Sequence, residues 1–274
     1  MECSYEPDFL EAGSGHRVIL VHSSVAGARQ WRALMDNLSD RFHLVAINLF
    51  GYGKTKPWPE GATQSLEDQA RLVEALVPAD GSRVSIVGHS FGGSVAMKAA
   101  ALLKGRMHRL VLIEPNPFYL LHLHGREEAY QEAVTLRDLI KAGTDATTWS
   151  RAAEYFANYW TGAGSWEVMP EDRRAKFIQA LRPNFHEWDS VMNEQVPLSE
   201  WARDLPKATT VISAADTVRS IDEIVSLMRK HIPNWTFEQT DHGGHMAALT
   251  HPDLMNPIIE NALNPNSGAA QQTG

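Results

Sequence analysis

The chain has 274 residues, and its 25 Lys and Arg against 33 Asp and Glu give a formal net charge of −8. Hydrophobic residues make up 43%, enough to bury the core of one large domain with an insertion. This acidity argues against nucleic-acid binding, and no apolar run approaches the roughly 18 residues that cross a bilayer. The single cysteine, Cys3, excludes an internal disulfide. Without a signal-like N-terminus, we expect a cytoplasmic protein.

Six short apolar runs predict buried strands. They span residues 17–22, 42–47, 84–87, 110–113, 209–213 and, less regularly, 235–238. Apolar residues at helical spacing, over 66–77 and 221–232, predict helices between them. Because continuous apolar runs suit parallel strands covered on both faces, we expect an α/β fold with a doubly wound, mostly parallel sheet.

The alternation of strand and helix stops between residues 116 and 205. This stretch has no clear strand run and holds 13 of the 23 aromatic residues. We expect a helical cap over 116–205, inserted into a core formed by 1–115 and 206–263. The aromatic residues indicate either an apolar pocket or the cap's own small core. The polar segment 264–274 is expected to be a disordered tail.

Residues 88–92 read Gly-His-Ser-Phe-Gly, directly after an apolar strand and before a run of small residues. This context predicts a sharp turn that holds Ser90 at a helix N-terminus, where backbone N–H groups favour negative charge. A serine hydroxyl becomes a strong nucleophile only when a base accepts its proton. The motif therefore predicts a nucleophilic serine with a histidine and an acid elsewhere in the chain.

His245, which follows a glycine pair and precedes the last helix, is the candidate base, with His242 as its competitor. Two carboxylates end predicted strands. Asp216 follows the fifth strand and is preferred as the acid, although aspartates before helices are often caps. Glu114, directly after the fourth strand, is the alternative acid.

An oxyanion needs backbone donors, and one is expected from the N–H of Phe91, the residue after the nucleophile. The second is assigned to the N–H of Ser24 in the loop after the first strand, with Ser23 as its competitor. The Ser24 hydroxyl is expected to cap the next helix. His22 is expected to organise this loop rather than to transfer protons.

These features together resemble the α/β-hydrolase family of serine hydrolases with a helical cap. The matching segments are residues 22–24, 48–53 and 88–93, together with Asp216 and 244–245. The resemblance implies a Ser90–His245–Asp216 triad, no cofactor, and a substrate pocket between core and cap. The chain departs from the family where Ser23 replaces the usual glycine after His22 and Asn48 replaces an aspartate.

We therefore expect a carboxylic ester hydrolase that cleaves an ester, thioester or lactone of a small, partly apolar molecule through an acyl-enzyme. A carbon–carbon hydrolase for a diketone-like substrate and a non-catalytic receptor on the same fold are the alternatives. Ser23, Tyr159 and Trp160 are the candidate pocket residues. The sequence names neither the substrate nor the oligomeric state.

Two other motifs are not expected to be functional sites. Gly-Lys-Thr at 53–55 lacks the earlier glycine of a phosphate loop. His122 and His124 have no nearby partners in the sequence, so no metal site is expected.

Overall fold

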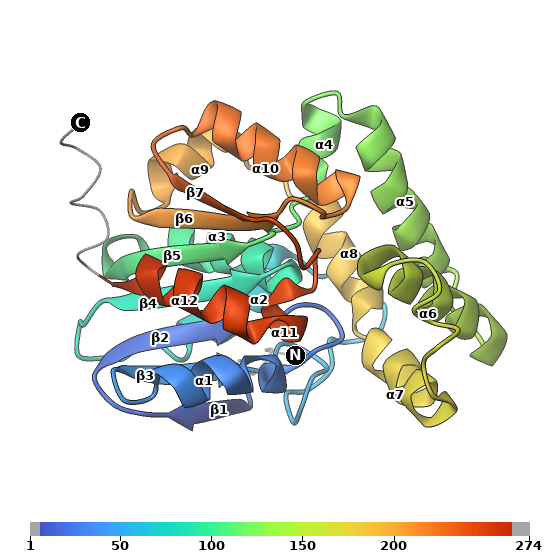
Figure 1. Cartoon of the computed structure of the whole chain (residues 1–274), viewed down its shortest axis with the longest axis horizontal. Coiled ribbons are helices and arrows are strands. Elements are labelled where there is room, and N and C mark those ends of the chain that lie inside the picture. Colours follow the sequence, from blue (N-terminus) through green and yellow to red (C-terminus); the bar gives the residue numbers. More distant parts are fainter. Residues whose placement is uncertain (1–5, 265–274) are drawn as a thin grey trace.

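A seven-stranded sheet forms the centre of the computed structural model, which describes residues 6–264 (Figure 1). Its order is β1-β3-β2-β4-β5-β6-β7, and only β1 runs antiparallel to its neighbour. The strands are β1 (Phe9–Ala12), β2 (His16–Val21), β3 (Phe42–Ile47), β4 (Val84–His89), β5 (Met107–Ile113), β6 (Thr209–Ala214) and β7 (Thr236–Thr240). The prediction of a mostly parallel α/β sheet is confirmed.

All six predicted strands are present, with ends displaced by up to three residues. The sequence analysis missed β1 because its four residues alternate between exposed and half-buried and form no continuous apolar run. This strand pairs with β3 at the edge of the sheet.

Helices cover both faces of the sheet because successive residues of a strand point to opposite sides. Val18 and Leu20 of β2 belong to one core, with α1 (Arg32–Leu38), α11 (Ala247–Thr250) and α12 (Pro252–Leu263). Ile19 and Val21 belong to the other core, with α2 (Leu66–Glu74), α3 (Phe91–Leu103), α9 (Leu198–Asp204) and α10 (Arg219–His231). The sheet thus has two separate apolar layers, one on each face.

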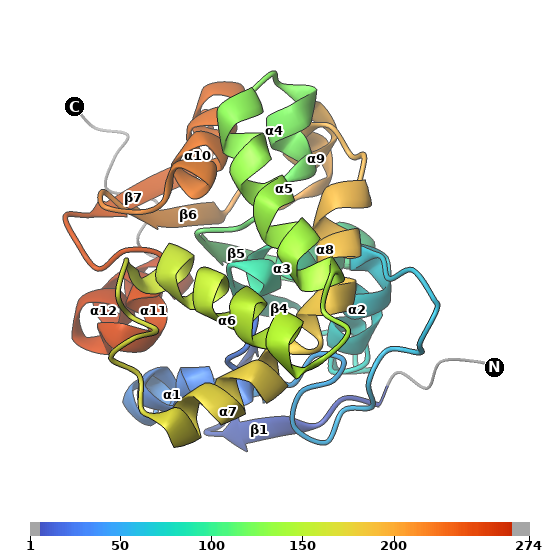
Figure 2. The same ribbon diagram turned by 90° about the vertical axis from the view of Figure 1, so that its right-hand side faces the viewer.

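The chain between β5 and β6 is helical, as predicted. It contains α4 (Tyr119–Leu123), α5 (Glu127–Lys141), α6 (Ala146–Thr161), α7 (Glu171–Leu181), α8 (Asn184–Asn193) and α9. Figures 1 and 2 show α5 to α8 gathered at one end of the sheet, with α6 crossing in front of it. The buried aromatic residues of this insertion, including Trp149, Trp160 and Trp188, belong to the same core as α2 and α3. They are therefore not a separate small core.

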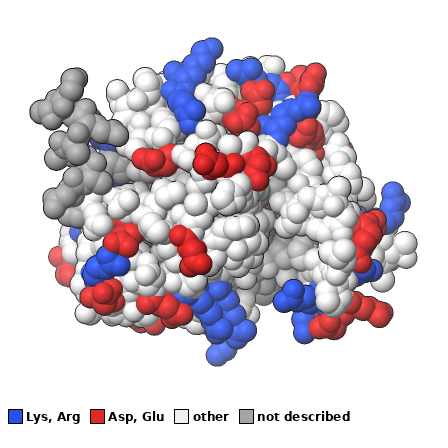
Figure 3. All heavy atoms as spheres, in the orientation of Figure 1, with Lys and Arg blue, Asp and Glu red and all other residues white. Residues whose placement is uncertain are grey.

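On the face drawn in Figure 3, acidic and basic side chains are interspersed. No helix among residues 6–264 is long and apolar enough to cross a membrane. The expected tail, apart from Asn264, lies outside the described residues.

Candidate active site

The turn from β4 into α3 holds Ser90 in a conformation that non-glycine residues rarely adopt, with φ 55° and ψ −120°. Glycines on both sides make this turn possible. A Cβ at Gly92 would lie 2.3 Å from the carbonyl oxygen of Val21, and one at Gly88 would lie 2.3 Å from that of Gly92. The backbone is therefore packed too closely for any side chain at these positions. Strain of this kind is concentrated at functional sites.

His245 connects Ser90 to a buried carboxylate. Its Nε2 accepts a hydrogen bond from Ser90 Oγ at 2.8 Å, and its Nδ1 donates one to Glu114 Oε2 at 2.7 Å. All three residues are buried, with exposed fractions of 4% or less. Ser90, His245 and Glu114 thus form a continuous line of hydrogen bonds shielded from water.

The carboxylate of Glu114 is fixed by two further donors. The Ala214 N–H donates to Oε1 at 2.8 Å, and Thr217 Oγ1 donates to Oε2 at 2.7 Å. Burial acts to raise the pKa of Glu114, but the hydrogen bond and charge of His245, together with these donors, outweigh it and lower that pKa. Glu114 also has a left-handed backbone, with φ 45°. This carboxylate is therefore ionised and held in one orientation.

The structure brings Glu114, the alternative acid, to His245 and holds Asp216, the preferred acid, away from the imidazole. Asp216 is exposed, and its carboxylate accepts hydrogen bonds from the N–H groups of Gly243 at 3.2 Å and Gly244 at 2.8 Å. The physical reason is its place in the sheet. Glu114 follows β5, which lies directly beside the nucleophile strand β4, whereas Asp216 follows β6, one strand farther away. The short Asp216 side chain holds the histidine loop, while the longer Glu114 side chain reaches the imidazole.

His242, the alternative base, lies apart from the hydrogen bonds that join Ser90, His245 and Glu114. His242 is exposed, and its ring packs edge-on against His251 at a centroid separation of 5.9 Å.

The loop after β2 lies beside Ser90 and presents one free amide. The N–H of Ser23 donates to Gln30 Oε1 at 3.0 Å, and the N–H of Val25 donates to Tyr52 Oη at 2.9 Å. Within residues 6–264, the N–H of Ser24 has no acceptor. Phe91 begins α3, so its N–H has no acceptor within the helix. These two amides are therefore free to donate to a bound group, whereas the Ser23 amide is occupied by Gln30.

Two histidines stabilise this region, and neither makes a hydrogen bond to the Ser90 side chain. His22 donates from Nδ1 to the carbonyl oxygen of Ser23 at 2.7 Å and accepts from the Leu49 N–H at 3.1 Å, so it organises the loop as expected. His89 donates from Nε2 to the carbonyl oxygen of His245 at 2.8 Å. Burial lowers the pKa of His22 to about 4 and that of His89 to about 3, so both rings are neutral at neutral pH.

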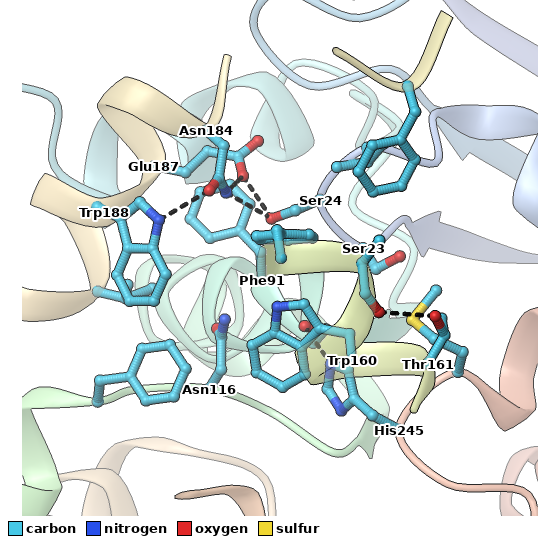
Figure 4. Close-up of a pocket in the computed structure, with 18 residues that line it drawn as sticks. Ser23, Ser24, Phe91, Asn116, Trp160, Thr161, Asn184, Glu187, Trp188 and His245 are labelled. Carbon is cyan, nitrogen blue, oxygen red and sulfur yellow. Dashed lines mark hydrogen bonds between the residues drawn. The ribbon is translucent and has the colours of Figure 1, made fainter. Parts of the chain in front are cut away.

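Ser90 and His245 line a pocket. Figure 4 draws the residues that surround it, His245 among them. Its lining is mostly apolar and comes from both the sheet end and the insertion. The lining residues are Ser23, Ser24, Val25, Ser90, Phe91, Asn116, Phe118, Phe156, Ala157, Trp160, Thr161, Phe177, Asn184, Glu187, Trp188, Val191, His245 and Met246. Of the expected pocket residues, Ser23 and Trp160 are present. Tyr159 instead lines a neighbouring cleft and donates a hydrogen bond to Glu132.

The sequence analysis missed Glu187, a carboxyl group from α8 that is 1% exposed. Ser24 Oγ, Tyr52 Oη and Asn184 Nδ2 all donate hydrogen bonds to it, the last two at 2.8 and 2.7 Å. Figure 4 shows Ser24 and Asn184 beside Glu187. The Ser24 hydroxyl therefore joins the loop to the insertion and does not cap the next helix, whose N-cap is Gly27. Burial raises the pKa of Glu187 in spite of these donors. No local sequence signal marks this residue, because its partners lie up to 163 positions away.

Within residues 6–264, no three His, Cys, Asp or Glu side chains are grouped so that they could hold a metal ion.

Comparison with known proteins places the chain in a family. Residues 18–258 match the family described as Alpha/beta hydrolase family. The chain is 28% identical over 262 residues to the lipase LipV of Mycobacterium tuberculosis, an alignment that covers 91% of this chain and 94% of that protein. It is 34% identical over 112 residues to the 2-hydroxy-6-oxo-2,4-heptadienoate hydrolase of Pseudomonas putida, covering 39% and 40% of the two proteins.

A solved hydrolase from Pseudomonas aeruginosa has the same fold, with a TM-score of 0.73 at 19% identity over 93% of each chain. Together with the match over residues 18–258, this fold shows that the chain belongs to the alpha/beta hydrolase family.

Proposed function

We propose that this protein is a serine hydrolase that cleaves a carboxylic ester through an acyl-enzyme intermediate. The observation that carries the proposal is the unbroken line of hydrogen bonds from Ser90 through His245 to Glu114. This is the arrangement that activates a serine hydroxyl: a base within hydrogen-bond reach, held in one tautomer by a carboxylate.

The reaction follows from these positions. Ser90 Oγ attacks the ester carbonyl carbon while its proton passes to His245 Nε2. The N–H groups of Ser24 and Phe91 stabilise the negative charge on the carbonyl oxygen. His245 then gives the proton to the leaving alcohol, and the carbon–oxygen bond breaks. Glu114 stabilises the imidazolium that forms between these two steps. A water molecule, deprotonated by His245, releases the acid and restores Ser90.

The pocket supports a neutral, partly apolar substrate. Its described lining has no Lys or Arg that could pair with an anion, and its one acidic side chain, Glu187, offers an anion no attraction. A substrate that carries a free carboxylate, as a ring-cleavage dienoate does, would be poorly bound there. The pocket therefore favours ester cleavage over carbon–carbon cleavage. The similarity to LipV, which is named a lipase, supports the same choice.

We further propose that residues 116–205 act as a cap on the pocket. Nine of the lining residues belong to α6, α7 or α8, which are parts of this insertion, and they line the same pocket as Ser90. Ordered side chains such as Trp160 and Glu187 make the cap a part of the site itself.

The test combines covalent labelling with turnover. A small fluorophosphonate should add once to the wild-type chain by intact mass and not at all to Ser90→Ala, and the wild type should hydrolyse a short nitrophenyl ester. A ring-cleavage dienoate should be turned over far more slowly. A folded wild type that neither labels nor hydrolyses the ester would overturn the proposal in favour of a receptor.

A further inference from the structure

Trp160 lies in the wall of the pocket on the cap helix α6. It is 7% exposed, and its indole ring packs against the imidazole of His245 with a centroid separation of 4.2 Å. Figure 4 shows the indole beside His245, among the side chains that enclose the pocket. Phe118, Phe156 and Tyr159 pack around it, so the ring has one defined orientation.

The indole nitrogen of Trp160 is fully buried and has no hydrogen-bond partner among the described residues. Buried donors are almost always paired, because an unpaired one loses its hydrogen bond to water without replacement. Three other indoles follow this rule. Trp58 donates to the Ala62 carbonyl oxygen, Trp188 to Asn184 Oδ1, and Trp201 to Tyr119 Oη. Trp31 is also unpaired, but it does not line the pocket.

The position of this donor relates it to the reaction. His245 Nε2 faces Ser90 and would deliver the proton to the leaving oxygen of the ester. A substrate group that lies against the Trp160 ring is therefore close to the leaving group. The carbonyl oxygen would lie elsewhere, at the N–H groups of Ser24 and Phe91. The stacking of the indole ring on His245 therefore points to the alcohol part of an ester, rather than its acyl part, as the partner of the free indole N–H.

We propose that Trp160 determines specificity by donating a hydrogen bond from Nε1 to an ether, carbonyl or hydroxyl oxygen in the alcohol part of the substrate. The preferred substrates are then oxygen-bearing esters, such as alkoxyalkyl or acyloxyalkyl esters, rather than plain alkyl esters. This inference rests on the proposed function, because it takes Ser90 and His245 as the acting pair.

The test uses two esters of the same acid, the 2-methoxyethyl and the n-butyl ester, whose alcohol parts have nearly the same shape. The ratio of their kcat/KM values is measured for the wild type and for a variant with 3-benzothienylalanine at position 160. This residue keeps the ring stacked on His245 but replaces the N–H by sulfur. We expect the preference for the methoxyethyl ester to fall about 3- to 10-fold, the value of one ordinary hydrogen bond.

The matched control is the same replacement at Trp188, whose N–H is already bonded to Asn184 within the same pocket. That variant should change both esters alike and leave the ratio unchanged. An unchanged ratio for the position-160 variant would overturn the proposal and leave Trp160 as a packing residue for His245.

A second pair, nitrophenyl methoxyacetate and nitrophenyl butyrate, places the extra oxygen in the acyl part. The ratio of kcat/KM values is measured for this pair as well. If the loss of the indole N–H changes the ratio for this pair but not for the first pair, the assignment to the alcohol part is overturned. Failure of the proposed function is recognised separately, because wild-type protein would then not be labelled at Ser90 by the fluorophosphonate.

Discussion

Glu114 and Asp216 offer a direct test of the catalytic geometry. Glu114→Gln places an amide opposite His245 Nδ1, where the carboxylate oxygen now lies 2.7 Å away. If the amide nitrogen faces the ring, Nδ1 must become the acceptor, and the ring proton moves to Nε2. The imidazole then presents a donor to Ser90 Oγ and can no longer take its proton. Loss of the tautomer-fixing acid costs about 10⁴ in kcat in serine proteases, or about 5.5 kcal/mol of transition-state stabilisation.

Asp216→Asn is the matched control. Asp216 is exposed and bonds only to the glycine pair of the histidine loop, and an amide oxygen still accepts one of those hydrogen bonds. We therefore expect kcat to fall less than about tenfold.

The assay is steady-state hydrolysis of a nitrophenyl ester by both variants, after thermal melts have shown that each is folded. The rate at which fluorophosphonate labels Ser90 should fall by a comparable factor in Glu114→Gln. Wild-type kcat in folded Glu114→Gln, together with a large loss in Asp216→Asn, would refute the reasoning from the hydrogen bonds.

Three further predictions concern stability and the oxyanion loop. Gly92→Ala should lower the free energy of unfolding in urea by about 3 kcal/mol, because the new Cβ would lie 2.3 Å from the Val21 carbonyl oxygen. Gly105→Ala is the control: its Cβ would meet no atom within 4 Å, so the free energy of unfolding should barely change. Glu187→Ala leaves three donors inside the protein without their acceptor, so we expect a loss of about 3 kcal/mol and a lower kcat. An unchanged kcat would show that catalysis does not depend on the bond between Ser24 and Glu187. The pKa values of His22, about 4, and His89, about 3, lie below that of an unfolded histidine, so only the unfolded chain gains these protons as the pH falls below about 6.5. The free energy of unfolding should therefore decrease by about 3 kcal/mol for the pair between pH 6.5 and pH 5, and a flat profile in urea titrations would contradict this.

The sequence alone determined the local features. Each buried strand is a continuous apolar run, so its place in the chain was readable without any partner. The turn at Ser90 was readable as well, because its glycines, the strand before it and the small residues after it are all neighbours in sequence. The same holds for the glycine pair before His245. Such signals depend on backbone sterics and short-range periodicity, which a sequence displays directly.

The tertiary structure alone decided which side chains meet. Glu114 and Asp216 carry the same local signature, a carboxylate just after a buried strand, and only the order of β4, β5 and β6 in the sheet separates them. The contact between Ser24 and Glu187 joins residues 163 positions apart on the loop and the cap. Composition and periodicity do not encode such distances, because they arise from how strands pair and how the insertion packs back over the sheet.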